Sequence, residues 1–170
     1  MALFFAQENI KKMPQLKNSS HRMVQNVGIF GTGLMGSGIG LWFLKNGHSI
    51  RVKDVSWQMI RNVYQGAYKL LKKQVARKKV KKFKIPLLMD TISSTVDNNG
   101  FGTMDMIVEA VPEQMAIKQK TLAEIEKSVN STTIIATNTS SLSIDDMAEK
   151  LQHPSRFLGV HFFSPVEKMP

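Results

Sequence analysis

The sequence predicts an α/β domain built on a doubly wound, mostly parallel β-sheet. Short apolar runs alternate with longer segments of helical periodicity, a pattern typical of parallel strands joined by helical crossovers. A glycine cluster lies between the first apolar run and the first helical segment. The length of 170 residues and the hydrophobic fraction of 42% suit one packed core. Residues 1–23 are polar and mixed, so we expect a lead-in there and the domain over residues 24–170.

The first half of this domain is expected to hold three strands and two helices. The strands are predicted at residues 24–30, 48–53 and 91–95. A helix over residues 34–46 would end before Gly47, because glycine is typical just beyond a helix C-terminus. Ser56 is a typical N-cap for a long second helix, whose apolar positions repeat at helical spacing. We expect the far end of that helix to stop by Pro86.

The second half is expected to hold three more strands and two more helices. The strands are predicted at residues 105–110, 132–137 and 157–163. The first two of these lack a polar alternation, as is typical of strands buried on both faces of a sheet. A helix is predicted over residues 114–129. Ser143 and Asp146 form a capping pattern that opens a short last helix.

The net charge of +10 comes from one segment rather than from the whole surface. No acidic residue lies between Asp54 and Asp90. Nine basic residues clustered at positions 69–84 of that interval supply +9, namely Lys69, Lys72, Lys73, Arg77, Lys78, Lys79, Lys81, Lys82 and Lys84. We interpret most of them as a solvated helix face. A nucleic-acid surface is the disfavoured alternative, because Phe83 is the one aromatic residue in the run and no nucleic-acid motif is present, so we expect no nucleic-acid partner.

The composition excludes two further classes of protein. Cysteine is absent, which excludes a disulfide-stapled scaffold and a zinc site made of thiolates. No apolar run approaches the roughly 20 residues that cross a bilayer as a helix, so we expect no membrane span. No metal site is expected either.

Three glycines, Gly31, Gly33 and Gly36, follow the first strand and open the first helix. This spacing is typical of a dinucleotide-binding loop: the first glycine makes the turn, the second lets a pyrophosphate approach, and the third lets helix and strand pack closely. The helix N-terminus presents N–H groups and the positive end of its dipole to the phosphates. Asp54 ends the second strand, where a carboxylate hydrogen-bonds ribose hydroxyls and repels a 2′-phosphate. We therefore expect NAD rather than NADP, in preference to a plain glycine-rich turn.

His161 differs in its position from the other three histidines of the chain. It lies near the carboxyl end of an apolar strand, and ligands of open α/β sheets bind at that edge. On the residues alone, a catalytic and a structural role both stay open.

Four separated segments resemble the 3-hydroxyacyl-CoA dehydrogenase family, in the order that the family has them. They are the glycine loop and residues 107–113, 136–142 and 159–170. Residues 52–54 and 164–170 are most similar to the multifunctional fatty-acid oxidation enzymes (the fatty oxidation complex alpha subunit), in which an enoyl-CoA hydratase half precedes the dehydrogenase half. The resemblance implies a Rossmann-type NAD-binding domain of an enzyme that oxidises (S)-3-hydroxyacyl-CoA to 3-ketoacyl-CoA in fatty-acid β-oxidation.

The resemblance also implies roles for individual residues. His161 would accept the proton of the 3-hydroxyl group, and Ser140 would contact both nicotinamide and substrate. Arg77 would contact the phosphates of the acyl-CoA substrate. The positions implied along the cofactor are Gly31, Gly33, Leu34, Met35, Gly36, Asp54, Val111, Pro112, Glu113, Lys118, Ser140 and Ser164. The alternatives are a turn serine at Ser140 and a solvated helix start at Glu113 and Lys118.

Two departures from the family pattern affect the expected activity. Ser164 stands where short-chain members usually carry Asn. The glutamate that the family pairs with its histidine and the helical C-terminal domain are both absent from the 170 residues, so we expect NAD binding without full activity. The resemblance further implies a parent that is a homodimer or part of a fatty-acid oxidation complex, cytoplasmic in bacteria and mitochondrial or peroxisomal in eukaryotes. A non-catalytic dinucleotide-binding module and another Rossmann hydroxyacid dehydrogenase are the alternatives.

Overall fold

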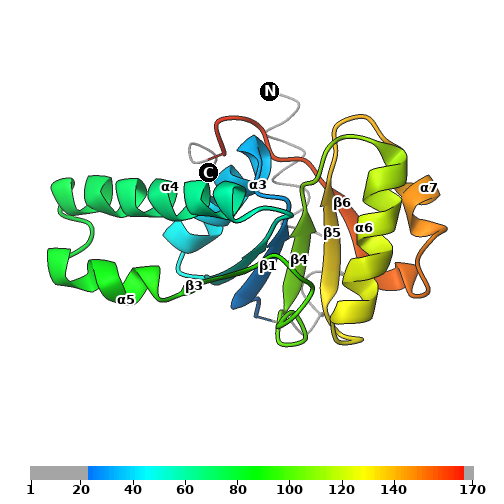
Figure 1. The fold of residues 1–170 in the computed structure, drawn as a ribbon, viewed down its shortest axis with the longest axis horizontal. Coiled ribbons are helices and arrows are strands. Elements are labelled where there is room, and N and C mark those ends of the chain that lie inside the picture. The colour runs from blue at the N-terminus through cyan, green and yellow to red at the C-terminus, as the bar shows by residue number, and fades with distance from the viewer. Residues whose placement is uncertain (1–22, 167–170) are drawn as a thin grey trace, which may run out of the picture.

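A computed structural model describes residues 23–166 and contains one six-stranded sheet, in which every pair of neighbouring strands is parallel (Figure 1). The strand order is β3-β2-β1-β4-β5-β6, so the chain moves outward in one direction and then returns to the centre to build the other half. The strands are β1 (Asn26–Phe30), β2 (Ser49–Lys53), β3 (Ile92–Thr95), β4 (Met106–Glu109), β5 (Ile134–Asn138) and β6 (Phe157–Val160). This confirms the predicted fold class. The expected lead-in, apart from Met23, lies outside the described residues.

Helices cover both faces of the sheet. They are α3 (Leu34–Lys45), α4 (Trp57–Ala76), α5 (Ile85–Met89), α6 (Met115–Ser128) and α7 (Ile144–Ala148), with short 3₁₀ turns η1 (Lys82–Lys84) and η2 (Pro154–Arg156). Both predicted caps are present. The Ser56 hydroxyl accepts a hydrogen bond from the Gln58 backbone N–H at 3.1 Å, and the Ser143 hydroxyl accepts one from the Asp146 N–H at 3.2 Å. Within residues 23–166, no helix combines the length and the apolar character that crossing a bilayer requires.

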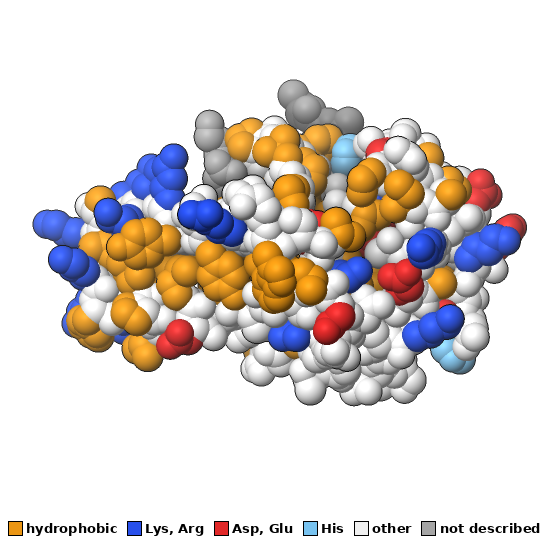
Figure 2. Space-filling model, in the orientation of Figure 1, with side chains coloured by type: hydrophobic (Ala, Val, Ile, Leu, Met, Phe, Trp, Pro, Cys, Tyr) orange, Lys and Arg blue, Asp and Glu red, His pale blue; other side chains and the backbone are white. Residues whose placement is uncertain are grey.

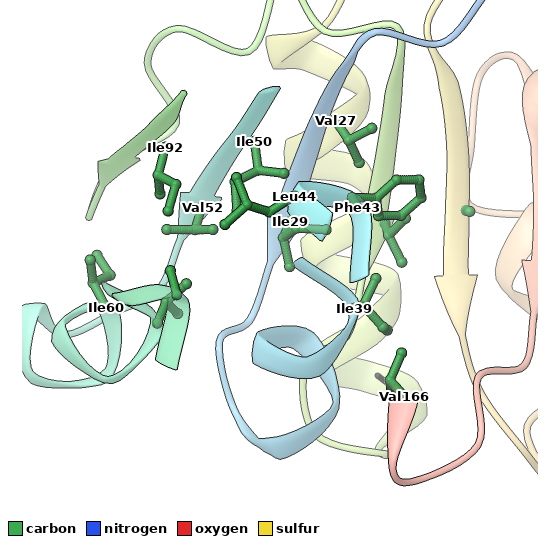
Figure 3. Close-up of a cluster of buried hydrophobic side chains, with 14 residues drawn as sticks. Val27, Ile29, Ile39, Phe43, Leu44, Ile50, Val52, Ile60, Ile92 and Val166 are labelled. Atoms are coloured by element: carbon green, nitrogen blue, oxygen red, sulfur yellow. The ribbon is translucent and has the colours of Figure 1, made fainter. Parts of the chain in front are cut away.

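The sheet separates two apolar clusters, one on each face. Val27, Ile29 and Ile39 belong to the cluster beneath α3 and α4, which Figure 3 shows in close-up. Phe30 and Ile107 belong to the other cluster, beneath α6 and α7. Neighbouring residues of β1 and of β4 therefore point into opposite clusters, which explains why these strands carry no polar alternation. The loops at the carboxyl ends of the central strands therefore follow strands that are packed on both faces.

The basic segment is organised differently from the prediction. The sequence predicted one helix that stops by Pro86, but α4 ends at Ala76, and Lys78 adopts a left-handed conformation with φ of 56°. Pro86 lies in the first turn of α5, where its missing N–H costs no intrahelical hydrogen bond. The helices α4 and α5 pack side by side as a hairpin that extends beyond the edge of the sheet (Figure 1). All nine basic side chains of the segment are exposed, and Figure 2 shows Lys and Arg gathered at that end of the molecule.

Candidate dinucleotide-binding and catalytic site

The glycine loop has a backbone that other residues could not adopt without displacement. Gly31 has a φ of +87°, and a Cβ atom there would lie 2.8 Å from the Ala110 carbonyl oxygen. A Cβ atom at Gly36 would lie 1.8 Å from the Gly31 carbonyl oxygen, so α3 begins directly against the turn. By contrast, no described heavy atom lies within 4 Å of a Cβ atom built at Gly33. The loop is therefore tight at its two ends and open at Gly33, as expected for a loop that receives a pyrophosphate.

A cleft of about 570 Å³ opens beside this loop; we call it the glycine-loop cleft. Its lining combines predicted cofactor residues with further apolar side chains and with two polar ones, Lys53 and Thr121. The full lining is Phe30, Gly31, Gly33, Leu34, Met35, Lys53, Asp54, Val55, Met59, Ala110, Val111, Pro112, Ile117 and Thr121. Among the described residues, no side chain caps the N-terminus of α3. Its first N–H groups are thus left for an anionic ligand, and the apolar walls suit a flat ring.

Asp54 is fixed at the mouth of this cleft by the loop itself. Its Oδ2 atom accepts hydrogen bonds from the backbone N–H and the hydroxyl of Thr32 at 2.6 and 2.7 Å, and its Oδ1 atom accepts one from the Val55 N–H at 2.7 Å. Oδ1 keeps acceptor capacity for a ribose hydroxyl. Thr32 was not predicted as a site residue, although its position inside the glycine motif was a usable signal.

A second cleft, of about 330 Å³, brings together residues from the loops that follow β4, β5 and β6; we call it the histidine cleft. It is lined by Met35, Glu113, Asn138, Thr139, Ser140, His161, Phe162, Phe163 and Ser164. Both predicted catalytic residues, Ser140 and His161, are therefore brought to one place, and Met35 lines this cleft and the glycine-loop cleft alike. Ser140 and His161 also line a neighbouring hollow of about 360 Å³ on their other side.

His161 is exposed at the rim of the histidine cleft, just beyond the end of β6. The prediction had continued this strand to Phe163. The ring of Phe163 packs against the imidazole, with 4.3 Å between ring centroids. Within residues 23–166, no carboxylate lies within ion-pair distance of His161. Glu167 lies outside the described residues.

Glu113 is bound to the turn that carries Ser140. Its Oε1 atom accepts hydrogen bonds from the Thr139 hydroxyl and from the Ser140 backbone N–H, the latter at 3.1 Å. Partial burial raises the pKa of this carboxyl group, but these hydrogen bonds and the nearby Lys118 ammonium together hold the pKa of Glu113 below its ordinary value. Glu113 therefore acts as an ionised clamp on the turn after β5.

Lys118 occupies a place that neither reading of the sequence predicted. The resemblance put it along the cofactor and the alternative put it on a solvated helix start, but its side chain is fully buried and lines neither of the two clefts. Its Nζ atom donates to both carboxylate oxygens of Glu109, at 2.9 and 3.1 Å. Burial raises the pKa of Glu109, while hydrogen bonds from Thr137 and Lys118 oppose that rise. A charge inside the protein needs such a partner, which explains the inward position of Lys118.

Arg77 lies away from both clefts, at the C-terminal end of α4. Met59, near the start of the same helix, lines the glycine-loop cleft. At about 1.5 Å per residue, Arg77 is roughly 25 Å further along the helix axis. The contact of Arg77 with acyl-CoA stays a prediction.

The fold and the loop define a class of protein. A parallel sheet of this order, with a glycine loop after β1 and a carboxylate after β2, is a dinucleotide-binding domain of the Rossmann type. Residues 26–170 match the family described as "3-hydroxyacyl-CoA dehydrogenase, NAD binding domain". The chain therefore belongs to the 3-hydroxyacyl-CoA dehydrogenase family, and the cofactor of its domain is NAD.

Solved structures of similar proteins agree with this assignment. FadB2 of M. tuberculosis is 31% identical with a TM-score of 0.79, over 88% of this chain and 53% of that one. The 3-hydroxybutyryl-CoA dehydrogenase of Escherichia coli is 28% identical with a TM-score of 0.80, over 87% of this chain and 31% of that one. The dehydrogenase part of multifunctional enzyme 1 from C. elegans is 29% identical with a TM-score of 0.73, over 89% of this chain and 34% of that one. This chain thus spans between about a third and a half of these relatives.

Proposed function

We propose that this chain is the cofactor-binding part of an enzyme that oxidises (S)-3-hydroxyacyl-CoA to 3-ketoacyl-CoA in fatty-acid β-oxidation. The observation that carries the proposal is the common position of Ser140 and His161 in one cleft that shares Met35 with the glycine-loop cleft. A proton acceptor and a cofactor site are thereby adjacent at the carboxyl edge of the sheet, as an alcohol dehydrogenation requires. The similar protein from E. coli supports the substrate class, since it is a 3-hydroxybutyryl-CoA dehydrogenase.

The residues of the glycine-loop cleft fit NAD. Bound NAD supplies the hydride acceptor for the carbon that is oxidised. The open backbone at Gly33 and the uncapped start of α3 would receive the pyrophosphate. Asp54 would accept hydrogen bonds from the adenine ribose and repel the 2′-phosphate of NADP.

In the proposed reaction, His161 removes the proton from the 3-hydroxyl group of the substrate. A neutral imidazole can accept this proton at a ring nitrogen that carries no hydrogen. The Ser140 hydroxyl would hydrogen-bond the same substrate oxygen. The acyl group would lie in the neighbouring hollow that Ser140 and His161 share with Leu142 and Ile144. Because no carboxylate of residues 23–166 lies within ion-pair distance of His161, we propose that residues 1–170 bind NAD but turn substrate over poorly.

Two measurements on residues 1–170 test the proposal. Titration calorimetry should show NAD bound more tightly than NADP, and tighter binding of NADP would contradict the assignment of Asp54. NADH oxidation in the presence of acetoacetyl-CoA should be weak. Rapid oxidation would show that His161 needs no carboxylate from outside residues 1–170.

A further inference from the structure

A fully buried ion pair is connected to the histidine cleft. The Glu109 carboxylate, at the end of β4, meets donors from three directions. Its Oε1 atom accepts from the Val111 backbone N–H at 2.7 Å, its Oε2 atom accepts from the Thr137 hydroxyl at 2.5 Å, and the Lys118 ammonium donates to both oxygens. Glu109 and Lys118 are both 0% exposed. This carboxylate therefore has one well-defined position.

The position of Lys118 is unfavourable with respect to the dipole of its own helix. Lys118 lies near the N-terminus of α6, where the helix dipole disfavours a positive charge. Taking a lysine and a glutamate out of water is also costly, and apolar residues of similar volume often stabilise a core equally well. The Glu109–Lys118 pair is present although the helix dipole and the loss of hydration both disfavour it. Its presence therefore points to a role at the site rather than to stability alone.

Lys118 connects Glu109 to the loop of His161. Besides the carboxylate, its Nζ atom donates to the backbone carbonyl of Asn138, the last residue of β5, at 3.0 Å. The side-chain oxygen of Asn138 accepts a hydrogen bond from the Phe162 backbone N–H, also at 3.0 Å. Phe162 follows His161 directly in the chain. The buried pair thus fixes the residue that holds the histidine loop.

Lys118 also connects Glu109 to the turn of Ser140. Its Nζ atom lies 3.5 Å from Glu113 Oε2. The other oxygen of Glu113 accepts from the Ser140 backbone N–H at 3.1 Å and from the Thr139 hydroxyl. Both residues predicted to act on the substrate are therefore linked to one ammonium group.

We propose that Glu109 is a positioning residue for the histidine cleft. It holds the Lys118 ammonium against Asn138 and Glu113, and so sets the ends of β4 and β5 where the nicotinamide ring would lie. Being fully buried, Glu109 touches neither cofactor nor substrate. The inference rests on the proposed function, because that function assigns the nicotinamide to this cleft.

The test compares two ligands on residues 1–170 by titration calorimetry. NAD reaches both clefts in the proposed arrangement, whereas ADP-ribose lacks the nicotinamide ring. For E109Q we expect the Kd of NAD to rise about tenfold, while the Kd of ADP-ribose stays within about twofold. E109Q leaves the buried ammonium without the closer of its two carboxylate partners, so E109L/K118M repeats the test with an apolar pair of similar volume.

E126Q is the matched control, because Glu126 is a nearly buried carboxylate at the opposite end of α6. It accepts from the backbone N–H groups of Gln152 and His153 and lies 3.7 Å from Arg156. E126Q should lower the melting temperature without changing the ratio of the two Kd values. If that ratio is unchanged in folded E109L/K118M, or if it changes equally in E126Q, Glu109 has no positioning role. If the unmodified chain binds neither ligand, the proposed function itself fails.

Discussion

Asp54 combines two tasks in one carboxylate: it holds the glycine loop through Thr32, and it places a negative charge at the cofactor cleft. D54N keeps the size of the side chain and removes the charge. We expect the Kd of NAD to rise about tenfold and the preference for NAD over NADP to shrink, because the 2′-phosphate is no longer repelled. Calorimetry with both cofactors measures this. E149Q, which changes an exposed carboxylate at the end of α7, should alter neither affinity.

His161 is expected to act on the substrate and not on the cofactor. In a 3-hydroxyacyl-CoA dehydrogenase that contains this domain, H161Q should lower kcat by roughly 10²–10⁴ because proton transfer is lost. The same substitution in residues 1–170 should leave the Kd of NAD nearly unchanged. A variant enzyme that keeps the original kcat would remove His161 from catalysis.

The turn between β5 and α7 is held by an ionised side chain, so its stability depends on pH. The pKa of Glu113 is lowered in the folded protein, which means that its contribution is present above the ordinary pKa of 4.5 and is lost as the pH falls through the lowered value. E113Q should therefore reduce the melting temperature at pH 7 by about 2 °C, a small effect because the side chain is 39% exposed. The difference should shrink as the pH falls below 4.5. Melting temperatures that differ by the same amount throughout the acid range would show that the charge of Glu113 does not matter.

At the scale of elements, the sequence predicted those features whose cause is local. Four of the six strands, β1, β4, β5 and β6, carry a short apolar run, and β2 alternates apolar with polar residues. Ser56 and Ser143 cap helices through hydrogen bonds within their own turn. The end of α4 had no comparable signal, because a lysine rather than a glycine adopts the left-handed conformation there. Pro86 was read as a stop, yet the same fixed φ suits the first turn of the next helix.

In the candidate site too, the features with a local cause were predictable and those that depend on distant residues were not. The glycine loop was predictable because its spacing encodes a turn and a close approach that only glycine permits. The burial of Lys118 was not, since a lysine in a helix is normally solvated and its partner Glu109 lies on a different element. The apolar walls at Val55 and Met59 also escaped prediction, because they depend on how α4 packs beside the sheet.

Across the whole molecule, the charge is divided between two regions. Residues 69–84 of the α4–α5 hairpin carry nine exposed basic side chains, whereas the charges of the rest of the chain nearly balance (Figures 1 and 2). This separation favours an anionic ligand that extends from the site toward the hairpin. It also fits a hairpin that is simply well solvated.

These two explanations differ in whether one particular basic side chain matters more for acyl-CoA binding than its neighbours do. If Arg77 contacts the phosphates of acyl-CoA, R77A in a dehydrogenase that contains this domain should raise the KM for acyl-CoA about two- to fivefold and leave the KM for NAD unchanged. The increase should shrink as salt is raised, because exposed charges are screened. K84A removes an equally exposed charge from η1, further along the same hairpin, and serves as the control. Steady-state kinetics at low and high salt distinguish the two explanations. A specific phosphate contact depends on the one side chain that makes it. If R77A and K84A change the KM for acyl-CoA by the same factor, the basic residues therefore form only a charged surface.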